Sequence, residues 1–561
     1  MSIVSVSQSV LQAISRALFS SSAIPSVPSD SVSLPDLPNE ILYEVACLLD
    51  KPGLYVFLLV NHRFHAIAEP VLWRELSSLV PILRLLPEYF DIQNLYPGIE
   101  LPHDVWERNR NIIRLAGHVR KLLIHPIADL NLDCHHVTFY EGARGRSMDW
   151  NALKAFARSI PVSSDFILFP LLQHLEVGSS FTCGISTKVL RPLLGPNVRT
   201  IVAHCPMNRL DHCIWRCDLR AFAYLEPSPT IYGRVQHVLP RMALTIPALH
   251  DIAPVISKMH TLRLRLNHGD GLLPLLRPAQ ATLRVFDVDI GHLAETVTDY
   301  KLLSLRSLTV RRQRPAFVCA LAGSVHLETI ELHDLIVPNS NSFAEITNKI
   351  KTGALRQVYI QERPPPPSQA RWSLKARHLE PLTSCSNLLS IDIRASSSIL
   401  ITDEEWAALA PSWPHMQYLR VQPYRPHRRD GNVNANTQVH APPSATMAAL
   451  IPIARSCRYI EELSIPLKMD DPVPSLENDP IPSQTRLTKF DLGEREIRLV
   501  GADTMDVVQF LRALFPELRH VKATRTNSSA NALAWDEVAD ALASTERYNE
   551  LLETRTNHTV N

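Results

Sequence analysis

The sequence has few glycines, with only 17 among its 561 residues. Loops that cradle phosphate groups depend on glycine, and neither a Gly-x-x-x-x-Gly-Lys nor a Gly-x-Gly-x-x-Gly pattern occurs. The nucleophile elbow Gly-x-Ser-x-Gly and the zinc motif His-Glu-x-x-His are absent from the sequence as well. We therefore expect a protein that is not an enzyme and needs no cofactor.

Cysteine is also scarce, and the nine cysteines are scattered along the chain and odd in number. Most lie in apolar runs, such as the Phe-Val-Cys-Ala run around Cys319. Buried reduced thiols explain this placement best, because a chain of this size needs no disulfide staples. We expect a cytoplasmic or nuclear protein, or one found in both compartments.

One segment gathers several residues of the types that bind zinc. No Cys-x-x-Cys pattern occurs, however, and Cys213 and Cys217 are four residues apart, a spacing that equally suits one apolar helix face. Cys134-His135-His136 is a weaker candidate still. We predict no metal site. The candidate zinc ligands are His204, Cys205, His212, Cys213 and Cys217.

Neither sign of charge dominates, since 57 Lys and Arg residues nearly cancel 56 Asp and Glu residues, for a net charge of +1. Such a balance provides no overall electrostatic field to attract nucleic acid or an anionic membrane. We expect neither as a partner, although a local basic patch stays compatible with the count.

The sequence also lacks a run of about 18 apolar residues, the length at which a helix can cross a bilayer. Residues 1–20 are the one candidate targeting segment, and they have no Lys or Arg before their apolar part. Because a secretory signal needs that charge and then an uninterrupted apolar core, we expect a mobile or weakly helical tail over 1–33.

The most informative segment follows the Ser/Pro-rich stretch 20–35. Apolar residues recur at helical spacing over 41–49, and Pro52-Gly53 stops that helix. A second apolar run, 54–60, leads into another helix, which Pro70 interrupts. We expect three short helices with more apolar surface than so small a unit can bury. The surplus predicts a partner, either another protein or the rest of the chain.

The order of these residues resembles an F-box. Asn61 departs from the family pattern, because many members have Cys there, and residues 76–87 resemble the same region of many fungal F-box proteins. The segment Leu-Pro-x-Glu-Ile-Leu alone fits the start of any amphipathic helix, but the later positions follow in the family's order. The matching positions are Leu37-Pro38-x-Glu40-Ile41-Leu42, Leu49, Val60-x-x-Arg63-Phe64 and Pro70-x-Leu72-Trp73.

This resemblance implies that residues 34–79 bind the Skp-type adaptor of cullin–RING ubiquitin ligases and, through it, a cullin. In that family the Leu-Pro pair and the apolar face of the helices lie at the adaptor interface. Transferred residue by residue, the adaptor-binding positions would be Leu37, Pro38, Ile41, Leu42, Val60, Phe64 and Trp73.

The remainder repeats a short pattern of apolar, two residues, apolar, one residue, apolar, as in Leu305-x-x-Leu308-x-Val310. With 45% hydrophobic residues, chance alone produces many matches, so the spacing of the units matters more than their number. Leu283, Leu305 and Leu327 begin successive units 22 residues apart. Helix-like segments at 402–409, 447–454 and 505–514 precede later units, with Thr402 and Thr504 as expected N-caps.

A helix, a turn and a strand repeated at roughly 20–30 residues resemble a leucine-rich-repeat solenoid. We predict an α/β fold in which a short N-terminal helical F-box precedes an irregular solenoid with parallel strands inside and helices outside. The repeat family's Asn is present once, at Asn267, and the spacing varies. An ordinary mixed α/β domain is the alternative.

The resulting layout divides the chain into five parts. The loops should lie at 362–372, 424–444 and 468–485. The parts are a tail (1–33), an F-box (34–79), a helical connector (80–110), a repeat array (111–525) and a partly helical C-terminal tail (526–561).

The resemblance to the F-box and repeat families implies a substrate-recognition subunit of an SCF-type ubiquitin ligase whose repeat array binds an unknown protein substrate. The alternative is a repeat scaffold for protein–protein interaction whose N-terminal helices only cap the solenoid. Exposure distinguishes the two, because an F-box leaves Leu37, Pro38 and neighbouring apolar side chains partly open, whereas a cap buries them.

Overall fold

A computed structural model of the chain divides it into two compact units, Met1–Met259 and His260–Asn561. The N-terminal helices belong to the first unit. The residues that the structure describes are 37–77, 79–83, 85, 109–124, 167–177, 193–203, 221–225, 256–268, 272–292, 300, 302–364, 372–424, 441–469, 471–476, 486–492, 504–522, 529–544, 547–549 and 551–552.

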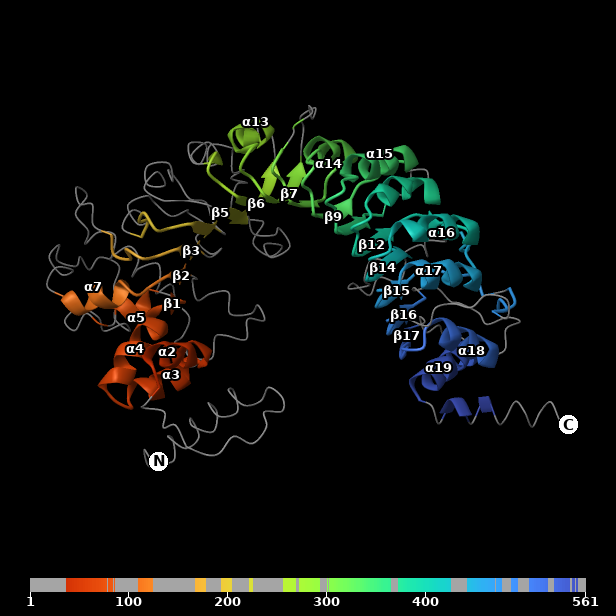
Figure 1. Ribbon diagram of the computed structural model, residues 1–561. Helices are drawn as coiled ribbons and strands as arrows, with labels where there is room; N and C mark the ends of the chain where they lie inside the picture. Colours follow the sequence, from red (N-terminus) through yellow and green to blue (C-terminus); the bar gives the residue numbers. More distant parts are fainter. Residues whose placement is uncertain are drawn as a thin grey trace. The chain divides into compact units, whose positions relative to one another are not determined.

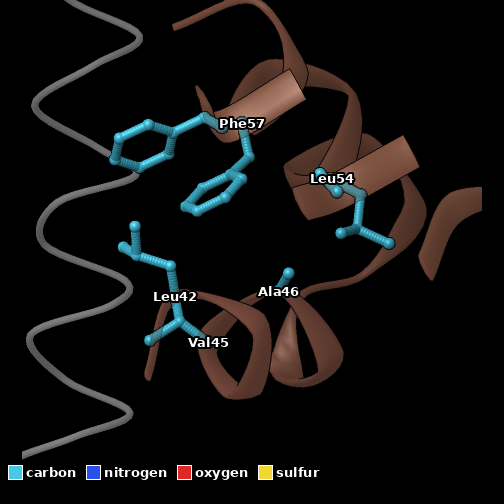
Figure 2. Close-up of a cluster of buried hydrophobic side chains, with 7 residues drawn as sticks. Leu42, Val45, Ala46, Leu54 and Phe57 are labelled. Carbon is cyan, nitrogen blue, oxygen red and sulfur yellow. The ribbon is translucent and has the colours of Figure 1, made fainter. Parts of the chain in front are cut away.

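Residues 37–77 form the three short helices that the apolar spacing predicts: α2 (Asn39–Leu48), α3 (Lys51–Leu58) and α4 (His62–Trp73). Their apolar faces meet in one core, where Phe57 and Phe64 have ring centroids 4.4 Å apart. Figure 2 shows side chains of this core converging from different helices. The core consists of Leu42, Val45, Ala46, Leu54, Phe57, Phe64 and Ala68.

Side-chain caps begin two of these helices. The Asp50 carboxylate accepts a hydrogen bond from the Gly53 N–H at 2.8 Å, and the Asn61 side chain accepts one from the Phe64 N–H at 2.9 Å. The expectation that Pro70 interrupts the third helix is wrong, because Pro70 lies inside α4. Proline removes one helical hydrogen bond there, and the burial of Phe64 and Ala68 keeps the helix on the core.

The first unit continues from α4 into a parallel sheet with the strands in chain order. The described short helices α5 (Val80–Leu83) and α7 (Arg110–Ala116) lie between its first two strands in sequence. The strands are β1 (Glu75–Leu76), β2 (Lys121–Ile124), β3 (His174–Val177), β4 (Thr200–Ala203) and β5 (Ala221–Leu225).

The second unit holds a longer parallel sheet in the order β6-β7-β8-β9-β10-β12-β14-β15-β16-β17. A small parallel pair, β11 (Ser373–Leu374) with β13 (Ser398–Ile399), lies apart from it. The main strands are β6 (Thr261–His268), β7 (Val285–His292), β8 (Ser307–Arg311), β9 (Thr329–Leu335), β10 (Gln357–Glu362), β12 (Ser390–Ala395), β14 (Tyr418–Pro423), β15 (Glu462–Ser464), β16 (Lys489–Asp491) and β17 (His520–Lys522).

Helices lie between many of the successive strands of the second unit, and α14 to α17 lie on one side of its sheet (Figure 1). Short 3-10 turns supplement them at 277–279, 376–378, 380–384, 410–412 and 447–449. The helices are α13 (Leu272–Leu276), α14 (Pro315–Leu321), α15 (Ser340–Ile350), α16 (Asp403–Leu409), α17 (Leu450–Ser456), α18 (Thr504–Leu514) and α19 (Ser529–Ala543).

The apolar pattern of the sequence marks the buried positions of these strands. Leu305, Leu308 and Val310 are at most 1% exposed, and strand pairing aligns Leu308 with Ile330, 22 residues later. Parallel strands in chain order, linked by helices, are the arrangement expected of a repeat solenoid rather than of an ordinary mixed sheet. The fold is therefore an α/β repeat solenoid preceded by short helices, as predicted.

Two predicted N-caps have different outcomes. Thr402 caps α16, and Glu405 Oε2 accepts a return hydrogen bond from the Thr402 N–H at 2.9 Å, which completes a capping box. Thr504 is instead the first residue of α18.

The predicted loops and tails lie partly outside the described residues, namely 1–36, 365–371, 425–440, 477–485 and the end of the chain after 552.

Candidate docking surface of the N-terminal helices

The three N-terminal helices leave much of their apolar surface exposed. Leu48 is 70% exposed and Leu59 is 71% exposed, values far above those of the neighbouring core, where Leu42 is fully buried. We call this set the open apolar surface. It consists of Ile41, Tyr43 and Leu48 on α2, Tyr55 on α3, and Leu59 and Val60 immediately after α3.

The residues before α2 are fixed to the start of α4. Arg63 Nη2 donates a hydrogen bond to the Leu37 carbonyl at 2.6 Å, and Arg63 Nε donates one to Asn39 Oδ1 at 2.7 Å. Leu37 is half-buried and packs against the helical core, whereas Pro38 is exposed at the N-cap of α2. The Leu-Pro turn is thus held in place with one residue packed inward and the other facing solvent.

The predicted adaptor-binding residues fall into two groups. Pro38, Ile41 and Val60 are exposed, while Leu37 and Trp73 are partly exposed. Leu42 and Phe64, at 0% and 1% exposure, belong to the core and support the helices from within. The apolar spacing identifies both groups as hydrophobic, but it does not say which side of a helix faces the core.

Sequence reasoning missed Tyr43, Leu48, Tyr55 and Leu59 as candidate contact residues. The signal for Leu59 was present, because the apolar run 54–60 supplies more hydrophobic residues than one helix face can bury. Only Leu54 and Phe57 of that run are fully inside. The remaining residues of the run extend beyond the core.

Helix α4 contacts the part of the first unit that follows it in sequence. Glu69 on α4 forms an ion pair with Arg114 of α7, and Arg114 Nη2 donates to Glu69 Oε1 at 3.0 Å. The hydrogen bond from Arg114 holds the pKa of Glu69 below its ordinary value, against the opposing effect of burial. Strand β1, which directly follows α4, pairs with β2. The helices are therefore attached to the first strands through α4, while residues of α2 and α3 stay open.

The described residues contain no group of His, Cys, Asp and Glu side chains arranged to hold a metal ion. The candidate zinc ligands at 204–217 and the triplet at 134–136 lie outside the described part of the chain. Within that part, no helix combines the length and the hydrophobicity needed to cross a membrane.

No protein-family model matches the sequence, and no curated protein matches it either. Among solved structures, an internalin from Listeria monocytogenes is similar over 64% of this chain and 82% of its own, with 13% sequence identity and a TM-score of 0.36. A chain of the yeast Rad7 and Elc1 complex is similar over 62% of this chain and 81% of its own, with 12% identity and a TM-score of 0.33. The strand order and pairing define the repeat fold independently of these resemblances.

Proposed function

We propose that this chain is a non-catalytic substrate-recognition subunit of an SCF-type ubiquitin ligase, of the kind found in fungi. The N-terminal helices would dock on a Skp-type adaptor and so on a cullin, and the repeat array would hold a protein substrate. The chain would supply position and effective concentration, while other subunits make the ubiquitin bond. Neither nucleic acid nor a membrane has a role in this proposal.

The open apolar surface is the observation that supports the proposal most strongly. Leu48, Tyr55 and Leu59 are each more than 60% exposed within the helical segment 37–77, although burying such side chains is favourable at about 1.5 to 3 kcal/mol each. Large apolar side chains that are this exposed are typical of a surface that a partner covers. The resemblance of residues Leu37 to Trp73 to the F-box pattern is the reason that we propose a Skp-type adaptor as the partner.

The second candidate is a repeat scaffold whose helices serve only as a cap. The Glu69–Arg114 ion pair and the β1–β2 pairing favour it, because both attach α4 to the repeat strands. A cap, however, buries its apolar residues against the neighbouring repeat. The exposure of Leu48 and Leu59 favours docking, and attachment through α4 is compatible with either function.

Co-purification of the full chain with a recombinant Skp-type adaptor tests the proposal. We expect the double variant Leu48→Lys/Leu59→Lys to weaken adaptor binding at least about a hundredfold, since interface anchors contribute roughly 2 kcal/mol or more each. Both side chains are about 70% exposed, so the fold should tolerate lysine. Adaptor affinity is measured by calorimetry, and folding is checked by circular dichroism.

Val325→Lys is the matched control, because Val325 is also 70% exposed but lies in the second unit. This variant should bind the adaptor as tightly as the unmodified chain. If the unmodified chain does not bind a Skp-type adaptor, the F-box assignment is wrong and the scaffold function takes its place. If the folded double variant binds equally well, the open apolar surface is not the adaptor-binding site.

A further inference from the structure

The sheet of the second unit has a polar face opposite the buried one. On β10, β12 and β14, the side chains of Val358, Ile391 and Leu419 are buried. The next residue on each strand faces the other way, and pairing aligns Tyr359 with Asp392 and Asp392 with Arg420. None of the described helices α14 to α17 lies on this side of the strands (Figure 1).

Two guanidinium groups share one carboxylate at this place. Arg394 holds Asp392 in a bidentate pair, with Nε to Oδ1 at 3.1 Å and Nη2 to Oδ2 at 2.9 Å. Arg420 Nη1 lies 3.5 Å from the same Oδ2, and Arg420 Nε is buried without a hydrogen-bond partner. The group of two arginines and one aspartate therefore has one surplus positive charge.

Several other cations described on the same face also pair with a carboxylate. Arg311 pairs with Asp287, Arg312 with Asp289, Lys489 with Glu462 and Lys522 with Asp491, each using a carboxylate from a neighbouring strand. At Asp392, by comparison, two arginines lie within ion-pair distance of one carboxylate.

Two tyrosines flank the surplus charge. The Arg394 guanidinium lies 5.3 Å from the ring centre of Tyr359, and that of Arg420 lies 5.3 Å from the ring centre of Tyr418. The Tyr418 hydroxyl donates to Asp392 Oδ2 at 3.4 Å. All four side chains are partly exposed, and tyrosine and arginine are the residue types enriched at the centres of protein interfaces.

We propose that Tyr359, Arg394, Tyr418 and Arg420 form an anchor that binds one Asp or Glu side chain from a segment of a partner protein. Arg420 would supply the main contact, because Arg394 is already engaged with Asp392. A carboxylate, with a charge of about −1, neutralises the surplus, whereas a phosphorylated residue brings about −1.5 to −2 and leaves a negative excess. This anchor deepens the proposed function, and it rests on that function only for identifying the partner as a ligase substrate.

The test uses the full chain and a phage library of random linear peptides as the probe. We expect selection on the unmodified chain to enrich peptides with Asp or Glu at one fixed position. The best peptide is then synthesised, and its affinity is measured by fluorescence anisotropy. Changing its acidic residue to the amide, or Arg420→Gln in the chain, should each weaken binding at least tenfold. Combining the two changes should add little.

The matched control is Arg306→Gln, which removes a cation that is paired with Glu328 outside the anchor and should leave peptide affinity unchanged. Arg420→Gln leaves the Arg394–Asp392 pair in place, and thermal unfolding checks that the variant is folded. Arg420→Lys is a second variant, and we expect it to retain part of the peptide affinity. Failure to enrich acidic peptides, equal affinity of Arg420→Gln, or tighter binding of a phosphoserine peptide would overturn the proposal. Adaptor binding by Arg420→Gln, measured in parallel, should be unchanged. Failure of the anchor proposal can therefore be distinguished from failure of the proposed adaptor binding.

Discussion

Glu362 ends strand β10 with its side chain only 1% exposed. Its Oε1 accepts a hydrogen bond from Trp372 Nε1 at 3.1 Å, and its Oε2 accepts one from the Ser396 N–H at 2.8 Å. Burial outweighs these hydrogen bonds and raises the pKa of Glu362 to about 7. A buried carboxyl that titrates near neutrality therefore links β10 to Trp372 and Ser396.

The raised pKa predicts how stability depends on pH. Between pH 4.5 and 7 the folded chain holds a proton on Glu362 that the unfolded chain has lost, so this contribution is fully present below pH 4.5 and is lost as the pH rises through 7. We expect Glu362→Gln to remove the dependence, which amounts to about 3 kcal/mol at most. Thermal unfolding at pH 5 and pH 8 measures the difference between the two chains.

The stability of the unmodified chain alone does not isolate the effect of Glu362, because His378 also contributes a pH dependence. Burial, together with Arg377 and Lys375, lowers the pKa of His378 to about 4, so its contribution is lost as the pH falls from 6.5 towards 4. This trend opposes that of Glu362, but it is common to the unmodified chain and to the variant. A stability difference between them that stays constant from pH 5 to pH 8 would contradict the assignment of Glu362.

At the scale of elements, the start of α4 depends on Asn61. Its side chain accepts the Phe64 N–H at 2.9 Å, one of the helix donors that has no partner within the helix. The same residue departs from the F-box pattern, in which Cys is common. Asn61 is thus a good helix cap at this position.

We expect Asn61→Ala to destabilise the helical core by about 1 kcal/mol, because it leaves the Phe64 N–H without its partner. Hydrogen exchange of amides in 62–68 measures this loss directly, since it reports on local opening. Asn61→Ser keeps an oxygen acceptor and should restore most of the protection. Equal exchange in Asn61→Ala and in the unmodified chain would mean that the cap contributes nothing.

Much of the fold is predictable from the sequence because each strand buries the same set of positions. The motif Leu327-x-x-Ile330-x-Leu332 matches three residues with no exposure, and its interval of 22 from the preceding unit reproduces the strand register. The placement of Pro70 was not predictable, because the helix through it is maintained by core contacts that local preferences do not report.

The candidate sites were predictable only in part. Hydrophobic spacing identifies Ile41 and Leu42 equally, although one is 45% exposed and the other fully buried, because the choice depends on where the neighbouring helices pack. The anchor around Asp392 could not be predicted from the sequence, because Tyr359 and Arg420 become neighbours of Asp392 only through the pairing of β10, β12 and β14. Sheet register, and not a local motif, creates that cluster.

At the scale of the whole molecule, the proposed function separates two tasks. In that proposal, adaptor docking would depend on α2 and α3 in the first unit, and substrate binding would depend on the sheet face of the second unit. Leu48→Lys/Leu59→Lys should therefore impair adaptor binding without changing peptide affinity, and Arg420→Gln should do the reverse. We propose above all that the open apolar surface is the adaptor-binding site.

Hydroxyl-radical footprinting of the full chain, read by mass spectrometry, tests that claim most directly, because it labels exposed Leu, Tyr and Val side chains. In the free chain we expect strong labelling of Leu48, Tyr55 and Leu59, and of Leu303 and Val325 as internal controls. Saturating Skp-type adaptor should suppress the first set and leave the two controls labelled. Unchanged labelling of Leu48, Tyr55 and Leu59 in the bound chain would contradict the account.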